Sequence, residues 1–76
     1  MSLISDVEKR ATNIMAGNKH LRYGQALFEA LATINQAAAT AINGTEADPF
    51  YASKKDDPRV EKFFLFLMAK ESEIAS

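Results

Sequence analysis

The stretch His20–Gln36 reads HLRYGQALFEALATINQ, and its apolar and polar positions fall on two faces of a helix. At 100° per residue, the apolar positions gather within an arc of roughly 140°. A strand would need an alternation of period two, which does not fit. The pattern therefore predicts a helix over about residues 20–35 around which the chain is organised. The apolar face holds Tyr23, Gly24, Leu27, Phe28, Leu31 and Ile34, and the polar face holds Arg22, Gln25, Glu29, Thr33 and Gln36.

Two positions in this helix invite a further interpretation. Gly24 costs about 1 kcal/mol relative to Ala in a helix interior. Because it lies on the apolar face, close approach of another backbone is expected there. Arg22, Gln25 and Glu29 form either a polar binding stripe or a solvated face with i, i+4 hydrogen bonds.

The composition limits the class of protein. The chain has 76 residues, no cysteine, 47% hydrophobic residues and a net charge of −1. We therefore expect one small folded domain without disulfides, for which oligomerisation is one route to stability. The charge excludes a globally basic nucleic-acid binder but not a local basic patch. No signal peptide or apolar run near the ~20 residues of a membrane span is visible, so a cytoplasmic protein without membrane contact is expected.

Shorter helices are predicted on either side of the central one. Ser5 and Glu8 form a capping-box pattern, so a first helix is expected over about residues 5–16. A break near Asn35-Gln36 followed by a short alanine-rich helix over about residues 37–43 is expected in preference to one helix of over twenty residues. Asn43-Gly44 is a strong stop signal for its end.

The segment 45–57 is the least regular part of the chain. Asp48-Pro49 resembles a cap followed by proline at the first helical position, which predicts a single helical turn over residues 49–52. Phe50 and Tyr51 are expected to plug one end of the core, and an exposed recognition pair is the alternative.

Asp57-Pro58 repeats the cap signal and predicts a last helix over about residues 58–71. Its run of six apolar residues, FFLFLM, wraps the helix more than once, so these side chains cannot all face the core. Acidic residues oppose the dipole at a helix C-terminus, so residues 71–76 are expected to fray. The core face is expected to hold Val60, Phe63, Phe64, Leu67 and Met68. Outside it, beside Lys62, should lie Leu65, Phe66 and Ala69.

The residues needed for catalysis are sparse. His20 is the only histidine, the three glycines are isolated, and the aspartates lack the spacing of a calcium loop. No serine or threonine has a basic partner at motif spacing. The sequence therefore predicts a protein that is not an enzyme and that uses no metal or cofactor.

Basic side chains gather around the corner between the first two predicted helices. They could contact a nucleic-acid backbone or an acidic protein surface, or they are ordinary surface charge. The short helix over residues 37–43 lacks Arg and Lys, so it would be a poor DNA recognition helix. The cluster consists of Lys9, Arg10, Lys19, His20 and Arg22.

The motifs R-x-G-Q-A-L-F at Arg22–Phe28 and D-P-F-Y at Asp48–Tyr51, with Gly44-Thr45 between them and an aromatic-rich last helix, resemble a loose family of short bacterial and phage-borne proteins of uncharacterised function. The resemblance covers about residues 20–67. It implies a small cytoplasmic protein and carries over no catalytic residue. Ala37 stands where that pattern has a helix-starting proline, which puts the break before the third helix in doubt.

These observations predict an all-α protein, a small compact bundle of about four helices with the second one central. We expect a non-enzymatic protein-interaction module that forms a homodimer. Leaving Leu65 and Phe66 in water would forgo about 1.5–3 kcal/mol each, so the predicted interface is Lys62, Leu65, Phe66 and Ala69. One alternative is a small nucleic-acid-associated regulator that uses Lys9, Arg10, Lys19 and Arg22. Another is a phage-type inhibitor of a host protein.

Overall fold

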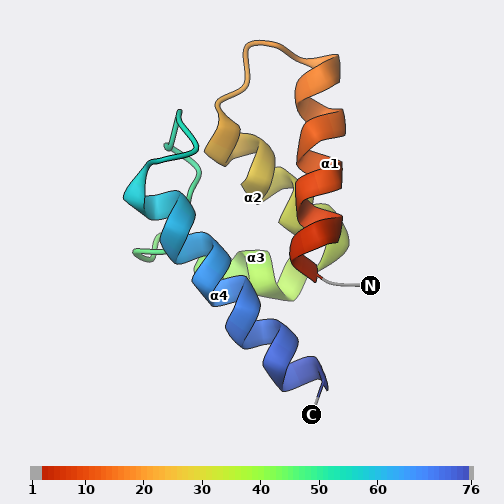
Figure 1. Cartoon of the computed structure of the whole chain (residues 1–76), viewed down its shortest axis with the longest axis vertical. Helices are drawn as coiled ribbons and strands as arrows, with labels where there is room; N and C mark the ends of the chain where they lie inside the picture. Colours follow the sequence, from red (N-terminus) through yellow and green to blue (C-terminus); the bar gives the residue numbers. More distant parts are fainter. Residues whose placement is uncertain (1–2, 76) are drawn as a thin grey trace.

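The central helix, α2 (Tyr23–Ile34), packs against α1 (Leu3–Gly17) on one side and α3 (Gln36–Ile42) on another, and α4 (Pro58–Ala75) also packs against α1 (Figure 1). The computed structural model describes residues 3–75, and the side chains of residues 3–72. Within that part the chain has four helices and no strand, which confirms the predicted all-α bundle. None of these helices is long and apolar enough to cross a membrane.

The apolar face of α2 is confirmed over most of its length. Gly24, Leu27 and Leu31 are buried. Ile34 is 38% exposed at the end of the helix, so its predicted place in the core is wrong. The helix also begins three residues later than expected, because Asn18 organises a turn before it. The Asn18 side chain accepts a hydrogen bond from the His20 amide, and its carbonyl accepts one from Leu21.

Asn35 separates α2 from α3. It has extended backbone angles, φ −150° and ψ 90°, and its amide donates to the Leu31 carbonyl at the end of α2. Its side-chain oxygen accepts a hydrogen bond of 3.1 Å from the Ala38 amide at the start of α3. One residue thus caps both helices, so the predicted break between them is confirmed.

Two predictions about helix ends are wrong for a shared reason. α1 begins at Leu3, so Ser5 lies inside the helix and is not its cap. Leu3 and Ile4 pack against the core and extend the helix. The Ile4 amide donates a 3.0 Å hydrogen bond to the Glu71 carboxylate of α4. A carboxylate is favourable at the N-terminus of α1, and α4 is helical to Ala75 where fraying from residue 71 is predicted. Ser76, the last residue of that prediction, lies outside the described residues.

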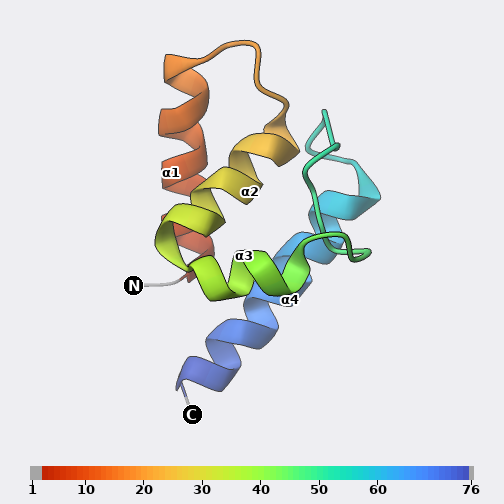
Figure 2. The same cartoon turned by 180° about the vertical axis from the view of Figure 1, so that it is seen from behind.

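The core is formed by all four helices, and two buried residues of the loop between α3 and α4, Pro49 and Ala52, close it. Seen from behind, α3 lies across α4 (Figure 2), and the buried side chains of both helices belong to one cluster. The C-terminal end of α4 projects beyond the other helices in both views. The cluster consists of Val7, Ala11, Ala26, Leu27, Ala30, Leu31, Ala38, Ala39, Ile42, Ala52, Val60, Phe63 and Leu67.

Two residues of α4 exchange their predicted places. Phe66 is half-buried and packs against the core, whereas Met68 is 55% exposed. Both lie near the borders of the core face, where 100° per residue does not settle which side chain turns inward. The predictions that Phe66 lies outside the core face and that Met68 lies on it are therefore wrong. Val60, Phe63 and Leu67 are buried as expected, and Phe64 is half-buried against the core.

Candidate protein-interaction surfaces

Two of the four exposed large hydrophobic side chains of the described part lie on the outer face of α4. Leu65 and Met68 are each 55% exposed, and Ala69 beside them is also exposed. They lie three and four residues apart, which places them side by side on one face of the helix. We define the outer face of α4 by the exposed residues Glu61, Lys62, Leu65, Met68, Ala69 and Ser72.

The polar neighbours leave this face open. The Lys62 ammonium forms an ion pair of 3.7 Å with Glu46, and the two side chains are 52% and 89% exposed. An ion pair this exposed contributes little to stability. Of the four predicted interface residues, Lys62, Leu65 and Ala69 lie on the outer face. Phe66 instead faces the core side, and the Lys70 ammonium lies 5.7 Å from the centre of its ring.

A second feature joins the start of α2 to the loop between α3 and α4. The Gly24 amide donates a 2.8 Å hydrogen bond to the Ala52 carbonyl. A Cβ atom at Gly24 would lie 1.8 Å from the Pro49 carbonyl oxygen and 2.8 Å from that of Ala52. Because this approach leaves no room for a side chain, the predicted reason for Gly24 is confirmed. We call this contact of residues 22–24 with residues 48–52 the junction.

Arg22 is part of the junction and not of an open basic patch. Its Nε donates a 3.2 Å hydrogen bond to the Phe50 carbonyl. Its guanidinium carbon lies 5.4 Å from the centre of the Phe50 ring and 5.5 Å from that of Tyr51, within the range of a cation–π interaction. Lys9, Arg10 and Lys19 remain exposed without Arg22, which weakens the predicted nucleic-acid patch.

Asp48 fixes the loop side of the junction. Its carboxylate accepts hydrogen bonds from the Gly44 amide at 2.8 Å and from the Phe50 amide at 3.0 Å. Gly44 has a φ of 79°, a backbone conformation that favours glycine. The Ala52 amide donates a 2.8 Å hydrogen bond to the Pro49 carbonyl. Residues 49–52 therefore form the predicted single turn, closed by a hydrogen bond between residues i and i+3, but they do not form a helix.

The two aromatic residues of this turn have different environments. Phe50 is half-buried and its ring meets that of Phe28 edge to face at 5.9 Å. Tyr51 is 71% exposed. The expected plug is therefore wrong for Tyr51, and buried Pro49 and Ala52 close the core beside Phe50.

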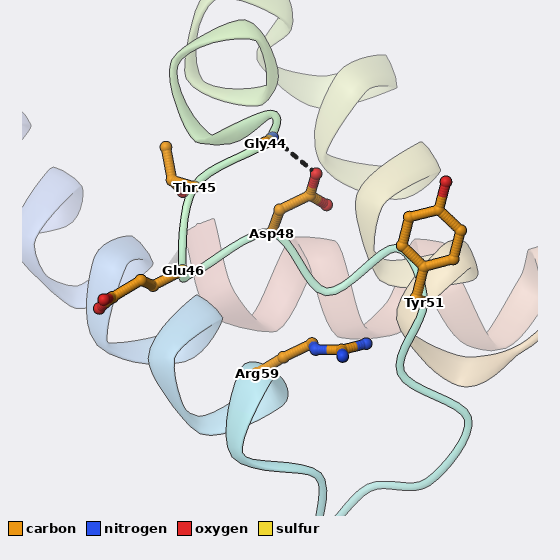
Figure 3. Close-up of a pocket in the computed structure, with 6 residues that line it drawn as sticks. All are labelled: Gly44, Thr45, Glu46, Asp48, Tyr51 and Arg59. Carbon is orange, nitrogen blue, oxygen red and sulfur yellow. Dashed lines mark hydrogen bonds between the residues drawn. The ribbon is translucent and has the colours of Figure 1, made fainter.

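Shallow hollows surround Tyr51. One of about 250 Å³ is lined by Tyr51, Arg59, Asp48 and the turn at Gly44 (Figure 3). The Asp48 carboxylate points toward Gly44, and the Tyr51 hydroxyl points away from Arg59 (Figure 3). Another, of about 320 Å³, lies against Phe28 and Phe50. The D-P-F-Y motif marks this surface in the sequence, but its proximity to Phe28 follows only from the fold.

The described side chains contain no group of three His, Cys, Asp or Glu residues that could hold a metal ion. His20 is exposed in the loop between α1 and α2. Gln25 and Glu29 of the predicted polar stripe are half-buried on α2. Tyr23 is half-buried, and this burial, together with the negative charge of Glu8, raises its pKa above the ordinary value of 10.0.

Comparison with known proteins adds no relative: no family model, curated protein or solved structure matches this chain.

Proposed function

We propose that the protein is a non-enzymatic cytoplasmic interaction module that forms a homodimer through the outer face of α4. The observation that carries this proposal is the exposure of Leu65 and Met68, at 55% each, on a helix whose opposite face is buried. Burying a large apolar side chain is worth about 1.5–3 kcal/mol when it is fully removed from water. When a partner buries the exposed half of such a side chain, the expected gain is therefore about 1 kcal/mol for each.

A second copy of the chain fits this face because the face is self-complementary. Its central line runs through Glu61, Leu65, Met68 and Ser72, at spacings of four, three and four residues. In an antiparallel pair of α4 helices, Leu65 of one protomer lies opposite Met68 of the other. Glu61 then lies opposite Ser72, whose hydroxyl can donate to the carboxylate. Ala69 adds no bulk beside this line, so the helix axes can approach closely.

Sedimentation velocity from low to high micromolar concentration tests the proposal. The wild type is expected to shift from monomer to dimer, because a single helix face buries less area than a tight dimer requires. Leu65→Glu should remain a monomer throughout, since it places a charge at the centre of the apolar line. A wild type that stays monomeric at the highest concentration would refute the homodimer.

Ile34→Glu is the matched control. Ile34 is another large apolar side chain exposed on a helix, at 38%, but it lies at the end of α2. The Ile34→Glu variant should dimerise as the wild type does. If Ile34→Glu abolished dimerisation and Leu65→Glu did not, the interface would lie elsewhere on the molecule.

A further inference from the structure

A hollow of about 320 Å³ lies between α2 and the loop that joins α3 to α4. Phe28, Phe50 and Tyr51 line it with aromatic rings, and Asn43 and Asp48 complete the lining. Neighbouring rings meet edge to face, with centroids 5.9 Å apart for Phe28–Phe50 and 5.2 Å apart for Phe50–Tyr51. Ring faces carry negative electrostatic potential, so a cation that stacks on a ring face in this hollow is attracted to it.

The formal charge of the lining residues is also negative. Asp48 carries the only ionisable carboxylate among the lining residues, and none of them is Lys, Arg or His. The backbone amides of Gly44 and Phe50 hold this carboxylate in place. Both are neutral donors, so the negative charge of Asp48 is not neutralised by them. A cation that enters the hollow therefore meets aromatic rings and a fixed carboxylate together.

The molecule already uses two of these rings to hold a guanidinium group. Arg22 lies 5.4 Å from the centre of the Phe50 ring and 5.5 Å from that of Tyr51. Arg22 is not among the residues that line the hollow. Its hydrogen bond to the Phe50 carbonyl fixes the turn. The exposed Tyr51 ring is thus already in position before any ligand arrives, which lowers the entropy cost of binding.

We propose that this hollow binds an arginine side chain presented by a partner protein. A guanidinium group is planar, stacks on aromatic rings and is less strongly hydrated than a lysine ammonium. It can also donate hydrogen bonds to the Asp48 carboxylate at the rim. Besides Arg22, the nearby cation is Arg59, which lines the adjoining hollow on the α4 side of Asp48 and Tyr51 (Figure 3). The partner is then a basic segment, distinct from the second copy proposed for α4.

The test is an NMR titration with blocked amino acids that mimic side chains in a peptide. N-acetylarginine methylamide should shift the ring resonances of Phe28, Phe50 and Tyr51. The citrulline analogue has nearly the same shape without the charge, and should bind at least about five-fold more weakly, which is the factor that a modest cation–π interaction contributes. Equal binding of the two probes, or shifts confined to other residues, would overturn the proposal.

Tyr51 gives the matched variants. Tyr51→Leu keeps an apolar side chain but removes the ring, and should weaken arginine binding about five-fold. Tyr51→Phe keeps the ring and should bind as the wild type does. Tyr51 is 71% exposed, so neither change should unfold the chain. An unchanged affinity in Tyr51→Leu would also overturn the proposal.

Two further probes define the ligand. N-acetyllysine methylamide should bind more weakly than the arginine probe, and equal binding would overturn the preference for guanidinium. Free arginine should bind no more tightly than the blocked form, and tighter binding would mean a free amino acid as ligand. The titration is repeated on Leu65→Glu, where an unchanged affinity is expected, so a failure of the α4 homodimer is distinguishable from a failure of this site.

Discussion

The junction and the outer face of α4 both lie near the molecular surface, but they differ in whether their groups have partners within the chain. In the junction, the Gly24 amide, the Arg22 side chain and the Asp48 carboxylate all have hydrogen-bond partners within 3.2 Å. On the outer face of α4, Leu65 and Met68 remain half-exposed without a partner surface. A change at Gly24, Arg22 or Asp48 should therefore affect the fold, whereas a change on the outer face of α4 should affect association.

The largest expected effect is that of Gly24→Ala. The added methyl group would lie 1.8 Å from the Pro49 carbonyl oxygen, a backbone atom that cannot move without the turn. We expect a loss of about 3 kcal/mol in the free energy of unfolding, the upper range for overpacking. Urea denaturation monitored by circular dichroism measures it.

Gly17→Ala is the control for this change. Nothing lies within 4 Å of the position that its Cβ would take, and the residue ends α1. Alanine is the better helix former by up to about 1 kcal/mol, so the control should be neutral or stabilising. If both variants lost the same stability, the close approach at Gly24 would not be the cause.

A smaller loss is expected for Asp48→Ala. The change leaves the amides of Gly44 and Phe50 without their acceptor, which should cost about 1–2 kcal/mol. Asp56→Ala removes the same charge from an exposed position of the same loop and should change stability by less than about 0.5 kcal/mol. Thermal unfolding of the two variants compares them, and equal losses would assign the effect to net charge instead of the turn.

The junction also shows which features local sequence patterns predict. The Asp57-Pro58 signal is confirmed, since the Asp57 carboxylate accepts a 2.8 Å hydrogen bond from the Arg59 amide at the start of α4. Gly24 on an apolar face predicts a close backbone, and that backbone is present. A glycine on the apolar face does not predict which backbone approaches it, because Pro49 and Ala52 are brought to Gly24 by tertiary folding.

The wrong predictions concern positions where a contact with a residue distant in the sequence determines the local structure. Ser5 matches a cap pattern, but Ile4 finds its acceptor in Glu71, 67 residues away. The same contact engages Glu71 near the end of α4, where an acidic residue is otherwise unfavourable. Phe66 and Met68 lie at the borders of a helix face, and packing against the core, which covers Phe66 and leaves Met68 exposed, depends on the tertiary fold. The aromatic hollow likewise depends on Phe28 meeting Phe50, which no spacing in the sequence indicates.

Alkaline pH gives a further test of the junction through Tyr23, which lies between Arg22 and Gly24. Burial and the negative charge of Glu8 raise the pKa of Tyr23 in the folded state above its ordinary value of 10.0. The folded state therefore holds this proton more tightly than the unfolded state does. Its contribution to stability is complete below the unfolded pKa and is lost as pH rises through the folded pKa.

Tyr23→Phe should therefore flatten the fall in the free energy of unfolding above pH 10, measured by urea denaturation at several pH values. Glu8→Gln should flatten it in part, because the charge of Glu8 is the smaller cause of the shift. An unaltered alkaline slope in Tyr23→Phe would mean that other groups titrate in this range.

The smallest expected effect on stability comes from the outer face of α4. At low micromolar concentration, where the protein is monomeric, Leu65→Glu should change the free energy of unfolding by no more than about 0.5 kcal/mol, as is usual for an exposed site. At high micromolar concentration the wild type should gain stability, because a dimer interface stabilises the folded state by mass action. Leu65→Glu should not gain it. A loss already present in the dilute variant would place Leu65 among the residues that hold the monomer together, and the contrast with the junction would then disappear.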